Sequence, residues 1–127
     1  MVLVNCCVSL GELLDKISIL RIKSVKIGDK KKKDYAVMEE QELMKVLEEL
    51  NLKGVESYLE RLVEINNKLW DIEDQIRAME AEGRFDDEFI QLARAVYISN
   101  DKRFEIKSEL NNHFGSSIKE VKSYKKY

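Results

Sequence analysis

Residues 55–82 form one long segment with helical periodicity, and this segment most limits what the chain can fold into. Its apolar residues recur at intervals of three and four, which is the pattern of one helix face. They are Tyr58, Leu62, Ile65, Leu69, Ile72 and Ile76. Gly54 precedes the segment and Gly83 follows it, and glycine commonly ends helices. We predict a helix over 55–82, about 42 Å long at a rise of 1.5 Å per residue.

Three further helices are predicted around this one. The first covers about 10–27, because Ser9 and Glu12 form a capping box before a run with helical spacing. The second covers about 34–52, with Asp29 or Asp34 as its cap. The last covers about 87–113, with Asp86 or Asp87 as its cap. The chain contains no proline, so nothing in these stretches forces a helix to break.

The two ends of the chain are predicted to be less regular. Residues 2–8 are rich in β-branched residues and form a possible short extended segment. Ser116 or Ser117 is expected to cap one or two helical turns before a basic tail. That tail carries lysines and the tyrosines Tyr124 and Tyr127, which either pack on the helices or contact phosphates or bases.

The fold class that follows is an all-α antiparallel bundle of about four helices. Short loops make sequential helices antiparallel neighbours, so 55–82 and 87–113 form a long hairpin that the other two helices partly cover. At 127 residues the chain fits a single domain over 1–127. The extra length of the hairpin should leave apolar surface uncovered, which favours a homo-oligomer.

Composition excludes several classes of function. The net charge is −2 despite 36% charged residues, so neither nucleic acid nor an anionic membrane is favoured as a partner. No apolar run approaches the roughly 18 residues that span a bilayer, and we expect a cytoplasmic protein. Cys6 and Cys7 are adjacent and should be free thiols. No zinc spacing or glycine-rich phosphate loop occurs, so no metal site and no particular cofactor is predicted.

The most informative polar residues lie on helix faces that should point inward. On a helical wheel, Asn66, Glu73, Arg77 and Glu80 fall within the apolar arc of 55–82. Polar side chains at core positions need hydrogen-bond or ion-pair partners, because burying them unpaired is costly. We call this predicted set of inward polar residues, with its counterpart on the next helix, the polar seam.

The helix over 87–113 supplies the other side of the polar seam. Its apolar face also carries Asn100, Lys107 and Asn111, flanked by Arg94 and Asp101. A second face of the first helix is ambiguous: it gathers Glu12, Asp15, Lys16 and Lys23, and it is either solvent surface or the wall of a cleft.

Two interpretations of the polar seam remain open. In the structural one, Glu73 pairs with Arg77 and Glu80 pairs with Arg94 across the hairpin, while the asparagines complete hydrogen bonds. Glu73→Gln should then lower the free energy of unfolding by about 1 to 3 kcal/mol.

In the functional interpretation, the polar seam is a ligand site. Arg77, Arg94 and Lys107 would converge on a phosphate or carboxylate, with Asn66, Asn100 and Asn111 adding hydrogen bonds. The ligand-binding candidates are therefore Asn66, Arg77, Arg94, Asn100, Lys107 and Asn111. Candidates for acid or base catalysis are Glu73, Glu80 and Asp101.

Four stretches of the chain resemble a known group of proteins: "SLGELLDKISILRIKSVKI", "NNKLWDIEDQIR", "FDDEFIQLARAVYISNDKR" and "GSSIKEVKSY". They are similar to small uncharacterised proteins of bacteria and their viruses, some encoded beside surface-polysaccharide genes. Residues 29–57 match nothing in that group. The resemblance implies a stand-alone helical domain of unknown function with a link to polysaccharide metabolism, and it assigns no catalytic residue.

Three functions follow from the sequence. The first is a binding or accessory domain that holds an anionic metabolite or partner in the polar seam. The second is an enzyme acting there on a phosphorylated or carboxylated small molecule. The third is a purely structural interaction or oligomerisation protein.

Overall fold

The structure, a computed structural model, describes residues 2–116 and 121–127. The described residues form four helices and no strand. The helices are α1 (Leu10–Lys26), α2 (Lys30–Glu49), α3 (Val55–Glu82) and α4 (Asp87–Phe114). The predicted all-α fold is confirmed, and the helix over 55–82 has the predicted bounds.

Local sequence signals set the ends of these helices. The Ser9 hydroxyl accepts a hydrogen bond from the Glu12 amide at 3.1 Å, so the predicted cap of α1 is formed. Gly83 ends α3 with φ of 68°, a left-handed conformation that glycine adopts without strain. Of the two expected caps of α2, Asp29 is the one formed, and it accepts a hydrogen bond from the Lys32 amide at 3.0 Å. α2 therefore begins at Lys30, earlier than the predicted residue 34. A carboxylate at this position satisfies an amide that has no partner within the helix.

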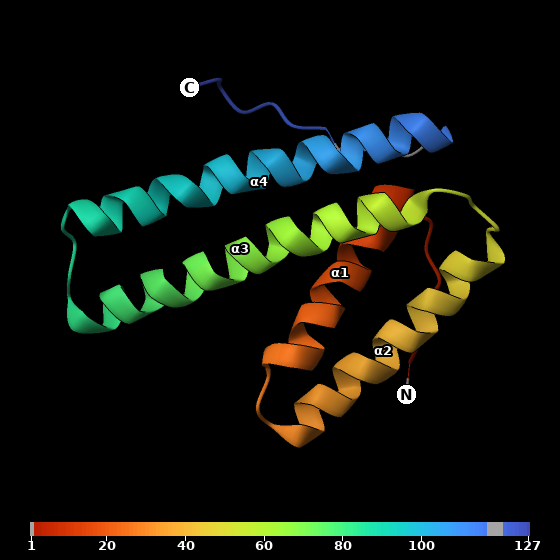
Figure 1. Cartoon of the computed structure of the whole chain (residues 1–127), viewed down its shortest axis with the longest axis horizontal. Coiled ribbons are helices and arrows are strands. Elements are labelled where there is room, and N and C mark those ends of the chain that lie inside the picture. Colours follow the sequence, from red (N-terminus) through yellow and green to blue (C-terminus); the bar gives the residue numbers. More distant parts are fainter. Residues whose placement is uncertain (1, 117–120) are drawn as a thin grey trace.

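Figure 1 shows how the two helical hairpins are arranged. α3 and α4 lie side by side and antiparallel, while α1 crosses them at a steep angle. α1 packs against both long helices, whereas α2 packs along α1. α1 therefore covers only one end of the α3–α4 hairpin.

The core lies where α1 meets that hairpin. Its side chains at 0% exposure come from three helices: Leu14, Ile17, Leu62 and Leu110. Leu47 brings α2 into the same cluster. At the other end of the hairpin, Phe85 and Ile90 are exposed, as the length of the two helices predicted.

The chain ends lie outside the bundle. Residues 2–8 are exposed and form no strand. The predicted helical turn after Ser116 falls mainly on 117–120, outside the described residues. Residues 121–127 run back along α4 (Figure 1). No helix in the described part of the chain has the length and apolarity needed to cross a membrane.

Candidate functional site

A buried cluster of polar residues joins α1 to the α3–α4 hairpin, and Asp15 of α1 is its centre. Asp15 is 3% exposed. The guanidinium of Arg103 in α4 donates two hydrogen bonds to this carboxylate, one of them from Nε to Oδ1 at 2.9 Å. Asn66 of α3 donates from Nδ2 to the same Oδ1 at 2.8 Å. The Asp15 carboxylate on α1 is therefore hydrogen-bonded to both α3 and α4.

Ser18 completes the hydrogen bonds around Asn66. The Asn66 amide nitrogen also donates to the Ser18 hydroxyl at 2.7 Å. That hydroxyl in turn donates to the backbone carbonyl of Asp15 at 2.6 Å. Both Asn66 and Ser18 are buried, so the amide plane of Asn66 is held in one orientation.

A second ion pair extends the cluster along α4. Lys107, whose side chain is 6% exposed, pairs with Glu12 of α1. Its ammonium also lies 3.9 Å from Oδ2 of Asp15. Two cations thus face two carboxylates, and this balance offsets the desolvation that burial imposes on each charge. We call Glu12, Asp15, Ser18, Asn66, Arg103 and Lys107 the Asp15 cluster.

A shallow groove of about 300 Å³ opens beside the Asp15 cluster. Its apolar wall is formed by Ile19, Ile22, Leu69 and Trp70. Its polar wall is formed by Asn66, Glu73, Asn100 and Arg103. We call this hollow between α1, α3 and α4 the Trp70 groove. Asn66 and Arg103 belong to both the groove and the buried cluster, so the cluster fixes part of the groove's lining.

The predicted ligand-binding residues are distributed over several places. Asn66 and Asn100 line the Trp70 groove, and the predicted catalytic candidate Glu73 lies there with them. Lys107 and Asn111 are buried against α1. The side-chain oxygen of Asn111 accepts a hydrogen bond from the Gly11 amide at 2.8 Å.

The predicted convergence of Arg77, Arg94 and Lys107 is not observed. Arg94 and Lys107 lie about 20 Å apart along α4 at a helical rise of 1.5 Å per residue. Arg77 has a side chain that is 80% exposed, and it lies 3.5 Å from Glu73 on its own helix. Arg94 is also exposed and donates to Gln91 at 3.3 Å. These two arginines lie beyond the region that α1 covers, which is why they face solvent.

The three candidates for acid or base catalysis are likewise apart. Glu80 is exposed, two helical turns beyond Glu73, and no ion pair between Glu80 and Arg94 occurs in the described residues. Asp101 of α4 accepts a hydrogen bond from the Tyr127 hydroxyl, and this bond is the main reason that the pKa of Tyr127 is raised. No pair of these carboxylates shares one site.

The sequence predicts Asn66 and Lys107 as site residues, and both lie in the Asp15 cluster, but it does not single out Asp15 and Arg103, which organise that cluster. Asp15 was placed on a face of the first helix that could equally have been solvent surface, and Arg103 was given no role. One signal was present: Arg103 and Lys107 are four residues apart, as are neighbours on one helix face, and Glu12 and Asp15 are three apart. Matching charge pairs on two helices can dock those helices against each other.

Within residues 2–116 and 121–127, no group of three or more histidine, cysteine, aspartate or glutamate side chains is placed to hold a metal ion. Cys6 and Cys7 are exposed free thiols.

Comparison with known proteins gives a family match over nearly the whole chain. The model of a family of unknown function, DUF6165, matches residues 4–127. The match includes residues 29–57, for which the resemblance in sequence had found no counterpart. No curated protein matches the chain, and no solved structure does.

Proposed function

The chain belongs to the DUF6165 family, whose function is unknown, and from its geometry we propose that it is a binding domain for a small hydroxyl-rich metabolite. The proposed site is the Trp70 groove. One observation carries the proposal: a partly exposed indole ring shares a single groove with four planar polar side chains.

This combination of groups suits a sugar ring. The C–H face of a pyranose packs on a flat aromatic surface, which buries apolar area without requiring a charge. Amide, carboxylate and guanidinium groups present paired donors or acceptors that can engage neighbouring hydroxyls. Asn100 and Glu73 supply such groups beside Trp70. A ligand with several hydroxyls and one apolar face would use both walls of the groove.

The Asp15 cluster supports the proposal because it holds two lining residues in place. Asn66 is fixed by Asp15 and Ser18, and Arg103 is fixed by Asp15. Side chains that are already ordered lose little conformational entropy when a ligand binds. The cluster would therefore act as the support of a preformed site.

Charge near the groove is largely balanced. Arg103 pairs with Asp15, and Arg77 pairs with Glu73. Hydrogen bonds and the indole ring would then contribute more to affinity than net charge does. Both neutral sugars and the anionic metabolites expected from the sequence, such as sugar acids and sugar phosphates, are candidate ligands.

The fluorescence of Trp70 tests the proposal directly, since Trp70 is the single tryptophan of the chain. We would titrate the protein with neutral monosaccharides, hexuronic acids and hexose phosphates. We expect a saturable change in emission with at least one probe. In Asn100→Ala the same probe should bind about tenfold more weakly, because hydrogen bonds to the ligand are lost.

The control variant is Gln75→Ala, an exposed position of α3 outside the groove. It should bind the probe as the unmodified protein does. Unchanged emission across the panel at millimolar concentrations would argue against a sugar site at Trp70.

A second candidate function is self-association through α2. Exposed apolar residues lie along one side of this helix at intervals that repeat with the helical turn: Tyr35, Met38, Val46 and Leu50. A second copy of the chain would remove this surface from water. Sedimentation equilibrium tests it, and Val46→Glu should shift a dimer toward the monomer. A monomeric unmodified protein at about 100 µM would contradict the idea.

A further inference from the structure

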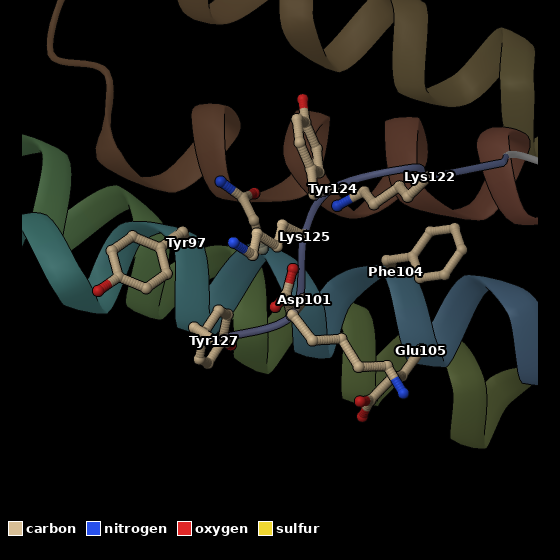
Figure 2. A pocket seen from close by; sticks show the side chains of 10 residues that line it. Tyr97, Asp101, Phe104, Glu105, Lys122, Tyr124, Lys125 and Tyr127 are labelled. Atoms are coloured by element: carbon tan, nitrogen blue, oxygen red, sulfur yellow. The ribbon is translucent and has the colours of Figure 1, made fainter.

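We propose that a second site, between residues 121–127 and α4, binds a nucleoside phosphate. A groove of about 900 Å³ lies there, close to the upper end of the size range of small-molecule pockets. Figure 2 shows the side chains of the C-terminal segment and of α4 that line it. This groove shares Asn100 with the Trp70 groove, but its other lining residues are different. The proposal does not depend on the function proposed for the Trp70 groove.

We call the groove between residues 121–127 and α4 the tail groove. Aromatic rings from both of these segments line it. α4 contributes Tyr97 and Phe104, and the C-terminal segment contributes Tyr124 and Tyr127. The rings of Tyr97 and Tyr127 meet edge to face, with centroids 5.2 Å apart, so they pack the end of the segment against α4. Phe104 and Tyr124 lie elsewhere in the groove (Figure 2). Flat aromatic surfaces of this kind accept a nucleobase by stacking.

Positive charge is concentrated in the same groove. Lys122, Lys125 and Lys126 line it. The Lys122 ammonium lies 5.1 Å from the centroid of the Phe104 ring and 5.9 Å from that of Tyr124. In the described residues it forms no ion pair with a carboxylate. A phosphate at this position would meet an ammonium placed directly beside stacking surfaces.

Two carboxylates also line the groove and limit where an anion can lie. Asp101 is engaged by the Tyr127 hydroxyl, which holds the end of the segment on α4. Glu105 lies with it on the α4 side (Figure 2). The phosphate would therefore face the lysines of the segment, while the base stacks on the rings. Aromatic surface and cations together favour a nucleoside phosphate over free phosphate.

Isothermal titration of the full-length protein with ADP tests the proposal, with adenosine and inorganic diphosphate as separate probes. ADP should bind more tightly than either fragment. The combined variant Lys122→Gln, Lys125→Gln, Lys126→Gln should weaken ADP binding about tenfold or more, because charge-assisted hydrogen bonds are lost.

The matched control removes the same number of charges elsewhere: Lys31→Gln, Lys32→Gln, Lys33→Gln, at exposed positions in α2. It should change ADP affinity less than about twofold. Tyr124→Ala, which alters only an exposed ring, should weaken ADP more than diphosphate. Three results would each overturn the proposal: no ADP binding at about 1 mM, equal weakening in the two triple variants, or diphosphate binding as tightly as ADP.

Discussion

The side-chain oxygen of Asn111 in α4 accepts a hydrogen bond 2.8 Å long from the backbone amide of Gly11, in the first turn of α1. Amides in the first turn have no partner within their own helix, so Asn111 satisfies one of them from another helix. The helices can approach this closely because residue 11 has no side chain. A Cβ there would lie 3.1 Å from the Lys107 carbonyl oxygen and 3.1 Å from the Asn111 side chain.

Gly11→Ala should lower the free energy of unfolding by about 1 kcal/mol. Overpacking against buried groups costs about 1 to 3 kcal/mol, and the better helix propensity of alanine recovers part of that. The buried Asn111 and the Lys107 backbone cannot easily move away. Thermal unfolding measures the difference. Gly28→Ala is the control, because a Cβ at Gly28 meets nothing within 4 Å, and its melting temperature should not fall.

Asp15→Asn should destabilise the fold by about 2 to 4 kcal/mol, because it leaves Arg103 and Lys107 without the carboxylate between them. The matched control is Glu73→Gln. Glu73 pairs with a largely exposed Arg77, and its loss should cost less than about 0.5 kcal/mol. This loss is smaller than the roughly 1 to 3 kcal/mol that a Glu73 buried in the polar seam would imply, because Glu73 is exposed in the structure. Equal losses in urea denaturation of the two variants would show that Asp15 is not the centre of the cluster.

Two buried serines should respond to alanine with opposite signs. Ser18→Ala removes the hydroxyl that joins Asn66 to the Asp15 carbonyl, and should cost about 1 to 2 kcal/mol. The Ser99 hydroxyl is buried and has no hydrogen-bond partner in the described part of the chain. Ser99→Ala should therefore stabilise by about 0.5 to 1 kcal/mol, helped by helix propensity. Chemical denaturation of both variants in parallel measures the signs; a destabilised Ser99→Ala would reveal a partner for that hydroxyl.

The start of α4 should loosen in acid. The hydrogen bond from the Phe89 amide lowers the pKa of Asp86 most, and the Arg84 guanidinium lowers it further. A lowered pKa in the folded protein means that the stabilisation is present at neutral pH. It is lost as pH falls below about 3.9, the value in unfolded chains, and through the folded pKa. Carboxyl carbon NMR can follow Asp86 directly.

Arg84→Gln provides the control for this titration. It should move the pKa of Asp86 part of the way back to its ordinary value, because the Phe89 hydrogen bond remains. An Asp86 that titrates at its ordinary value in the unmodified protein would contradict the capping arrangement.

Local sequence alone determined the helices and their ends. Gly83 and Gly115 end α3 and α4 with φ of 68° and 70°, and glycine favours that conformation whatever packs nearby. The Ser9 and Asp86 caps likewise involve residues three positions apart. Such signals can be read from the sequence because both partners are close neighbours in the chain.

The tertiary structure alone decided which polar residues are buried. Periodicity gives the side of a helix on which a residue lies, but not how far along it a third helix will cross. Asn66 and Arg77 lie on the same predicted arc of α3, yet only Asn66 lies where α1 covers the hairpin. The pairing of Asp15 with Arg103 depends on that crossing, because these two residues are far apart in the chain. The sequence thus determined four helices and their faces, while the position of α1 determined the site.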